Sequence, residues 1–372
     1  MKTPKKDQAY LNNHSPKARI LQIGNYPPPI CGWAIHTQAV HRALTEAGAA
    51  SQVLDLGPGR RISERECLPV ANGFDYVKKV IASRVRGYTF EIHINGDTWK
   101  RYLLALTAAA VGCMTGKPAV LMFHAGPKQL YFPRNRGFWF HAFRWLFQMS
   151  GEIICNLESV KTAILGYGIP AQKVHAIFSV QYHPEQIPVP LPEPVGRFLE
   201  AHEPRLFSYT LFRPEFTMDC LFEAFAQIRR EFPRAGLLIV GPPEVPADAR
   251  ASMRLLGVES SVLVAGNLPR AEFLTAIKSS DVFVRTHLRD GLCSSVLEAL
   301  NLRVPVVAAE DGIRPPSVIT YAPADTADLT RALLHVLSNL ETVRAQVQPP
   351  ELHNSLDEEV SLLLSVATRA TP

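Results

Sequence analysis

The stretch DVFVRTHLRDGLCSSVLEALNLRVPVV, from Asp281 to Val307, combines a strand, a loop, a helix and a second strand in close succession. An apolar run ends near His287, a glycine-containing loop follows, and a helical pattern begins near Ser294. Strands that alternate with helices are typical of parallel sheets. The first amides of such a helix are unpaired and point outward, so they can bind a phosphate. The stretch therefore predicts an α/β unit with an anion site at its loop.

Two carboxylates flank this loop. A carboxylate repels a phosphate, so Glu298 is better suited to vicinal hydroxyls such as those of a nucleotide ribose, and Asp290 to the hydroxyls of a sugar beyond a diphosphate. Gly291 lets the backbone approach a ligand closely, and Ser294 can cap the helix or donate to a phosphate. The alternative interpretation is an aspartate that complements the helix dipole and a solvated glutamate.

The same alternation of apolar runs and helical patterns extends over most of the chain. Runs that are apolar on both faces indicate parallel sheets covered by helices on both sides. The expected strands span residues 19–26, 51–57, 89–95, 118–126, 152–157 and 173–178, and then 204–210, 235–242, 261–266, 281–287, 304–310 and 317–323.

A proline-dense segment, HPEQIPVPLPEPVGRF, separates these two blocks of strands. The chain has 372 residues, which favours two domains. We predict a flexible segment over 1–18, a first Rossmann-like domain over 19–182, a linker over 183–203, a second Rossmann-like domain over 204–350 and a terminal helix over 351–372. Ligands of such sheets bind at the carboxyl ends of the strands, so we expect the site in a cleft between the domains.

Composition narrows the class of protein. Hydrophobic residues make up 47% of the chain and charged residues 20%, and the net charge is +5. This mild excess suits an anionic ligand or a membrane surface and is too weak to indicate nucleic acid. The six cysteines form no C-x-x-C pair, and the N-terminus has no apolar signal region, so we expect reduced thiols and a cytoplasmic location.

Several motifs together resemble a known family. The D-x₇-E spacing from Asp290 to Glu298, followed by VPVVA and a glycine, is similar to the E-x₇-E motif of retaining GT-B glycosyltransferases, particularly glycosyltransferase family 4. The segments Gly24–Leu44, Leu221–Gly241 and Val262–Val284 resemble other parts of that family. The resemblance implies two Rossmann-like domains facing a cleft, a nucleotide-diphosphate sugar as donor, transfer with retention and no metal.

The resemblance also assigns further site residues. It places Gly32, just before a helix, at the diphosphate from the first domain, and His124, at a strand end, beside the donor sugar. His93 and Asn95, which end the preceding strand, are expected on the same face. Backbone groups at Gly291, Leu292, Cys293 and Ser294 would bind the leaving diphosphate.

One part of the pattern departs from the family. Family members usually carry an arginine and a lysine where this chain has Leu211 and Phe216. We expect Arg213 to replace the missing cations, with Arg285, Arg289 and Lys128 as alternatives.

Two stretches of the first domain combine basic and aromatic residues. Phe74–Tyr88 is predicted to form a basic amphipathic helix, and Leu130–Met149 is rich in Phe, Trp and Arg. Such faces suit anionic lipid headgroups, although half-buried helices with snorkelling cations give the same pattern.

The sequence therefore predicts a glycosyltransferase with a hydroxyl acceptor, which is a glycan, a lipid-linked molecule or a small molecule. Asp290 and His124 would be catalytic, Glu298 would bind the ribose, and Gly32 and Arg213 would bind the diphosphate. Two alternatives stay open: another GT-B enzyme, such as a nucleotide-sugar epimerase, and a degenerate GT-B protein that only binds a nucleotide sugar.

Overall fold

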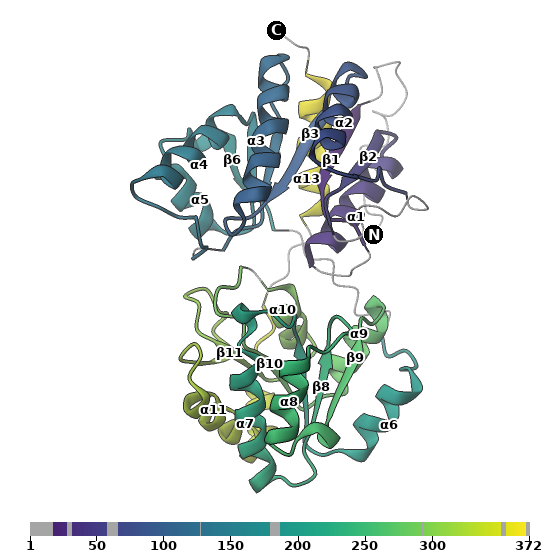
Figure 1. The fold of residues 1–372 in the computed structure, drawn as a ribbon, viewed down its shortest axis with the longest axis vertical. Coiled ribbons are helices and arrows are strands. Elements are labelled where there is room, and N and C mark those ends of the chain that lie inside the picture. Colours follow the sequence, from purple (N-terminus) through teal and green to yellow (C-terminus); the bar gives the residue numbers. More distant parts are fainter. Residues whose placement is uncertain are drawn as a thin grey trace, which may run out of the picture.

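The computed structural model describes residues 18–27, 32–57, 66–126, 128–178, 187–291, 293–350 and 355–369. Figure 1 shows two lobes, one above the other, each built around a sheet. Within the described residues, no helix has the length and apolar character needed to cross a membrane.

The first sheet is six-stranded, entirely parallel, and ordered β2-β1-β3-β4-β5-β6. Its strands are β1 (Arg19–Gly24), β2 (Ala50–Asp55), β3 (Thr89–Ile94), β4 (Val120–Phe123), β5 (Glu152–Cys155) and β6 (Val174–Ala176). The helices between them are α1 (Gly32–Glu46), α2 (Gly73–Val85), α3 (Trp99–Met114), α4 (Phe138–Met149) and α5 (Glu158–Leu165), followed by the short η1 (Ala171–Lys173). We call this unit the first domain.

The second sheet is also six-stranded and parallel, in the order β12-β11-β10-β7-β8-β9. Its strands are β7 (Arg205–Tyr209), β8 (Gly236–Val240), β9 (Val262–Gly266), β10 (Val282–Arg285), β11 (Val306–Ala309) and β12 (Val318–Tyr321). Its helices are α6 (Glu193–Ala201), η3 (Pro214–Phe216), α7 (Met218–Glu231), α8 (Ala247–Leu255), η4 (Glu259–Ser261), α9 (Arg270–Lys278), α10 (Ser294–Asn301), α11 (Thr326–Ser338) and α12 (Leu340–Gln346). This unit is the second domain, and the predicted fold class, two Rossmann-like domains in the GT-B arrangement, is confirmed.

Alternating strand residues divide each core into two layers. In β1, Leu21 and Ile23 pack with α2, α3 and α4, whereas Ile20 packs with α1 on the opposite face of the sheet. In the second domain, α7, α8 and α11 cover one face and α6, α9 and α10 cover the other. Both faces are therefore buried, which is why the strands are almost continuously apolar.

The last helix, α13 (Leu356–Thr368), returns to the first domain. Figure 1 shows it in yellow beside the purple β1, although the chain between them passes through the whole second domain. Val360, Leu363 and Ala367 are buried against Ile20 and Val40. The expectation that the C-terminal helix crosses back is confirmed.

The predicted linker, residues 183–203, differs from the structure in its second half. Residues 193–201 form α6, whose Val195 and Leu199 are buried in the second domain. Pro194 lies in the first turn of this helix, where its missing N–H has no intrahelical partner to lose. Prolines that suggested a linker here mark the start of a helix instead.

Candidate functional site

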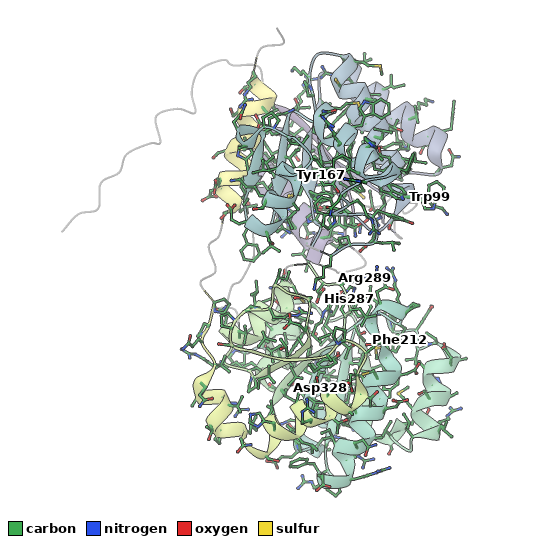
Figure 2. All side chains as sticks on the ribbon, turned by 90° about the vertical axis from the view of Figure 1, so that its left-hand side faces the viewer. Trp99, Tyr167, Phe212, His287, Arg289 and Asp328 are labelled. Atoms are coloured by element: carbon green, nitrogen blue, oxygen red, sulfur yellow. The ribbon has the colours of Figure 1, made fainter. Side chains whose placement is uncertain are left out.

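A cavity of about 280 Å³ lies between the two domains. The carboxyl ends of both sheets face this cavity. Many of the residues that line it are the last residue of a strand or lie one or two positions after a strand. From the first domain these are Asn95, His124, Asn156 and Phe178, and from the second Tyr209, Val240, Asn267 and Arg285. Figure 2 shows the labelled His287 and Arg289 at the edge of the second domain that faces the first.

Two helix N-termini meet at this cavity. Helix α10 begins at Ser294 and α1 begins at Gly32, and a Cβ placed on Gly32 would lie 3.7 Å from the Ser294 hydroxyl oxygen. Gly32, Gly291, Cys293 and Ser294 all line the cavity, whereas Leu292 lies outside the described residues. Unpaired amides at both helix starts would favour a negatively charged group between them.

Asp290 lines the same cavity but is already engaged by two arginines. Arg285 donates to both carboxylate oxygens, at 2.7 and 2.8 Å, and Arg314 donates to one at 3.2 Å. Burial opposes ionisation of Asp290, but the Arg285 guanidinium outweighs it and holds the pKa of Asp290 well below its usual range. Asp290 is thus an ionised carboxylate, and its hydrogen-bond partners in this structure are the side chains of Arg285 and Arg314.

Glu298 is buried in the second-domain wall of the cavity. Arg270, at the start of α9, donates to its two oxygens at 2.9 and 2.6 Å. The bidentate pair fixes the carboxylate at a cavity that Arg270 and Phe273 also line. This geometry leaves Glu298 with further lone pairs for a diol.

Arg213 is not where the sequence placed it. Its side chain is 63% exposed, its guanidinium lies 4.0 Å from Glu215, and it is not among the described residues that line the cavity. The main chain turns at Arg213 into η3, which directs this side chain to solvent. The expected compensation by Arg213 is therefore wrong in this structure.

Another arginine, Arg285, lies beside one of the two positions that lack a cation, and Arg314 binds the same carboxylate as Arg285. Phe216 is buried, and the Arg285 guanidinium lies 5.1 Å from the centre of its ring. Arg285 ends β10 and lines the cavity, and Arg314 joins it through Asp290. Arg285 was one of the predicted alternatives; Arg314 was not predicted.

The first-domain wall carries a cluster of aromatic and imidazole rings. His93 Nδ1 and His124 Nε2 lie 3.0 Å apart, and the Trp33 ring lies 4.8 Å from that of His124. Burial, reinforced by His93, His36 and Arg101, holds the pKa of His124 well below its usual value. The imidazole of His124 is therefore neutral, which suits a hydrogen bond to a sugar hydroxyl.

Sequence reasoning missed several residues of this site. His36 and Asn156 line the cavity, and Arg270 and Arg314 bind its carboxylates. His36 could have been found, because residues four apart share a helix face and Gly32 was already assigned. No sequence pattern indicated that Arg314 pairs with Asp290, because the two residues are distant in sequence.

The second domain matches a known family. Residues 198–344 match the family described as glycosyl transferases group 1. A glycosyltransferase 1 domain-containing protein 1 from Xenopus tropicalis is 30% identical over 90 residues, which are 24% of this chain and 26% of that protein. One of the subunits of phosphatidylinositol N-acetylglucosaminyltransferase from Arabidopsis thaliana is 21% identical over 142 residues, which are 37% of this chain and 31% of that protein. These matches thus span about a quarter to a third of the relatives' own lengths.

Solved structures share the fold over nearly the whole chain. A glycosyltransferase from Rickettsia africae aligns with a TM-score of 0.67 at 14% identity, covering 95% of this chain and 100% of that one. HepE from Anabaena, in complex with UDP and glucose, gives 0.65 at 14% identity, with 94% and 97% covered. A proposed UDP-N-acetylglucosamine 2-epimerase from Listeria monocytogenes gives 0.63 at 15% identity, with 93% and 95% covered. The protein thus has a GT-B fold whose second domain resembles the group 1 glycosyltransferases.

Proposed function

We propose that the protein is a retaining glycosyltransferase that moves a sugar from a nucleotide-diphosphate sugar to a hydroxyl acceptor. The observation that carries the proposal is the meeting of α1 and α10 at the interdomain cavity, beside the buried carboxylate of Glu298. An anion site next to a diol acceptor matches the diphosphate and ribose of such a donor. The group 1 match over residues 198–344 supports the same class of reaction.

Each residue of the cavity would have a distinct task. Glu298 would accept hydrogen bonds from the ribose hydroxyls, and the amides around Ser294 would bind the diphosphate from one side while Gly32 binds it from the other. His124 and Asp290 would contact the transferred sugar. No metal is needed in this arrangement, because fixed amide dipoles would stabilise the leaving charge.

The reaction would break the bond between the anomeric carbon and the diphosphate and form a bond to the acceptor oxygen. The anomeric centre becomes cationic as the diphosphate leaves, so a nearby ionised carboxylate stabilises the transition state more than the bound sugar. Domain closure would exclude water, which otherwise competes as acceptor.

The test is a panel of nucleotide sugars, followed by product analysis with and without hydroxyl acceptors. We expect one donor to raise the melting temperature and to yield a glycosylated acceptor together with the free nucleotide diphosphate. Binding of no nucleotide sugar would contradict the proposal.

Two alternatives are decided by the same experiment. The fold likeness to a proposed epimerase favours a reaction on the nucleotide sugar itself, which would give products without any acceptor. The uncharged Leu211 and Phe216, with Arg285 tied to Asp290, favour a protein that only binds, which would show a thermal shift and no product.

We further propose that the first domain rests on an anionic membrane, which would make a lipid-linked acceptor accessible. Helix α2 carries an apolar stripe of Phe74, Val77, Ile81 and Val85, with Phe74 84% and Val85 83% exposed. Lys78 and Arg86 are exposed beside it. Trp99 and Leu103 of the adjoining α3, and Phe138 and Trp145 of α4, are also exposed. An exposed apolar stripe with flanking cations fits the boundary between headgroups and acyl chains.

Vesicle sedimentation tests the membrane proposal. Replacing Phe74 and Val85 by Ser, or Lys78 and Arg86 by Glu, should abolish binding to phosphatidylserine vesicles, and salt should release the wild type. Lys79 is a poor target, because it already pairs with Asp75 at 2.7 Å. The matched control is Leu255→Ser, since Leu255 is equally exposed but belongs to the second domain. No binding of the wild type at low salt would refute the proposal.

A further inference from the structure

Helix α13 places a fully buried carboxylate behind the cavity. Glu359 has no exposed surface, and its Oε1 lies 2.9 Å from Nε2 of His36. His36 lies one turn after Gly32 in α1 and lines the cavity. The pair thus connects the C-terminal helix directly to the first-domain wall of the site.

We propose that Glu359 is a positioning residue that holds His36 as a cation, with its Nδ1–H available to the phosphate end of the nucleotide co-substrate. This inference rests on the proposed function for the identity of the ligand. It adds α13 to the site, although the family match ends at residue 344.

The charge on His36 follows first from burial. A buried carboxylate needs a compensating charge or it becomes too costly to ionise. His36 bonds directly to Glu359 at 2.9 Å, so a protonated imidazole contributes to this compensation. Glu359 accepts from Nε2, which leaves Nδ1 as the other donor of the ring.

The two carboxylates near His36 favour the same state. Glu91 of β3 adds to the effect of Glu359, whereas Arg101, the cation near His124, opposes a further positive charge, and the rings of His93 and His124 add no negative charge. Burial opposes protonation of His36, but Glu359 and then Glu91 outweigh it and raise its pKa above the usual value.

His36 and His124 therefore differ in charge on the same wall. Their ring centres lie 5.5 Å apart, and the pKa of His124 is held low, mainly by burial. A neutral imidazole suits a sugar hydroxyl, and a charged one suits a phosphate oxygen. Gly32 begins the same helix and lies close to Ser294 of the other domain. His36, one turn further along α1, would therefore contact a phosphate bound at the start of this helix.

The pairing itself can be tested without a ligand. Imidazole nitrogen NMR of the full-length protein, with His36 assigned by the signals lost in His36→Gln, should show both ring nitrogens protonated at neutral pH. In Glu359→Gln the titration midpoint of His36 should fall. A neutral His36 in the wild type overturns the proposal even if the variant does not fold, and so does an unchanged midpoint in a folded variant.

The role toward phosphate is tested by binding. Among UDP, GDP and ADP, the nucleotide with the largest thermal shift is compared with its nucleoside. Glu359→Gln should weaken the diphosphate by about ten-fold and the nucleoside by less than about two-fold. Equal losses for both would refute the phosphate contact. If no nucleotide binds the wild type, the proposed function fails, while the NMR result still decides the pairing.

The first domain offers a matched control. His175 and Glu152 form a second pair, also at 2.9 Å, in which Glu152 accepts from Arg369 at the end of α13 as well, and neither His175 nor Glu152 is among the described residues that line the cavity. Glu152→Gln should leave the ratio of diphosphate to nucleoside affinity unchanged. A loss as selective as that in Glu359→Gln would indicate a general effect on the domain and overturn the proposal.

Discussion

Asp290 has two roles at the site: it borders the cavity and it pairs with buried arginines. It borders the cavity where a sugar is expected, yet Arg285 and Arg314 bind both of its oxygens. The side chains of these arginines are nearly buried, at 7% and 4% exposure, so Arg285 depends on Asp290 for compensation, and Arg314 is shared between Asp290 and Asp311. Any contact to a sugar would be added to this network.

Asp290→Asn should therefore destabilise the fold as well as slow turnover. Removing one partner of a buried ion pair costs about 3 kcal/mol of unfolding free energy. Urea unfolding at pH 7 measures the loss, and Arg213→Ala, at an exposed site, should change stability by less than about 0.5 kcal/mol. A variant as stable as the wild type would contradict the role of Asp290 as anchor.

The stability contributed by Asp290 should also depend on pH. Because the folded-state pKa is held below the unfolded value of about 4, the contribution is fully present above that value and declines as the pH falls through the folded pKa. The difference between wild type and Asp290→Asn should thus shrink in acid. A difference that grew below pH 4 would show the opposite linkage.

Glu298 gives the sharpest test of the nucleotide site. If it holds the ribose diol, Glu298→Ala should weaken nucleoside and nucleotide diphosphate alike, by about ten-fold or more, since both contain the ribose. Calorimetric titration of both ligands measures this, with the exposed Glu341→Ala as control. Unchanged nucleoside affinity would remove the ribose assignment.

At the scale of elements, helix α13 stabilises the first domain through side chains that it buries there. Leu363 is 1% exposed and packs among Ile20, Val40 and Met122. Leu363→Ala should lower the free energy of unfolding by about 2–5 kcal/mol, whereas the exposed Ser361→Ala should have little effect. Urea unfolding followed by first-domain tryptophan fluorescence reports the loss; an unchanged transition would mean that α13 is only loosely attached.

At the scale of the whole molecule, the domains approach each other through glycines. A Cβ on Gly126, after β4, would overlap the Asp290 carbonyl oxygen and lie 2.9 Å from Cα of Gly291. Only a residue without a side chain permits this approach of the two backbones. The contact holds His124 and Asp290 at the same cavity.

Gly126→Ala should therefore separate the domains without unfolding them. A displacement of about 1 Å between reacting groups reduces turnover by about a hundred-fold. Turnover and the radius of gyration from X-ray scattering measure the effect, and Gly73→Ala is the control because its Cβ meets no atom within 4 Å. Normal turnover in Gly126→Ala would show that this approach is not needed for catalysis.

The sequence alone determined both sheets, because the period and length of apolar runs are local properties that burial on both faces imposes. It also located Gly32, His124 and Asp290, which follow a strand or begin a helix, and Glu298, which lies in the second turn of α10, at a cavity whose position the parallel topology dictates. The helix α6 was mistaken for a linker because proline is also common in the first turn of a helix.

Only the tertiary structure decided which charges meet. Arg270 binds Glu298, Arg314 binds Asp290 and Glu359 binds His36, over separations of 28, 24 and 323 residues. No local period encodes such pairs, because they form only after the helices have packed and water has left the site. Arg213 was near in sequence but turned to solvent, whereas Arg285 was drawn inward because it ends a buried strand beside Asp290.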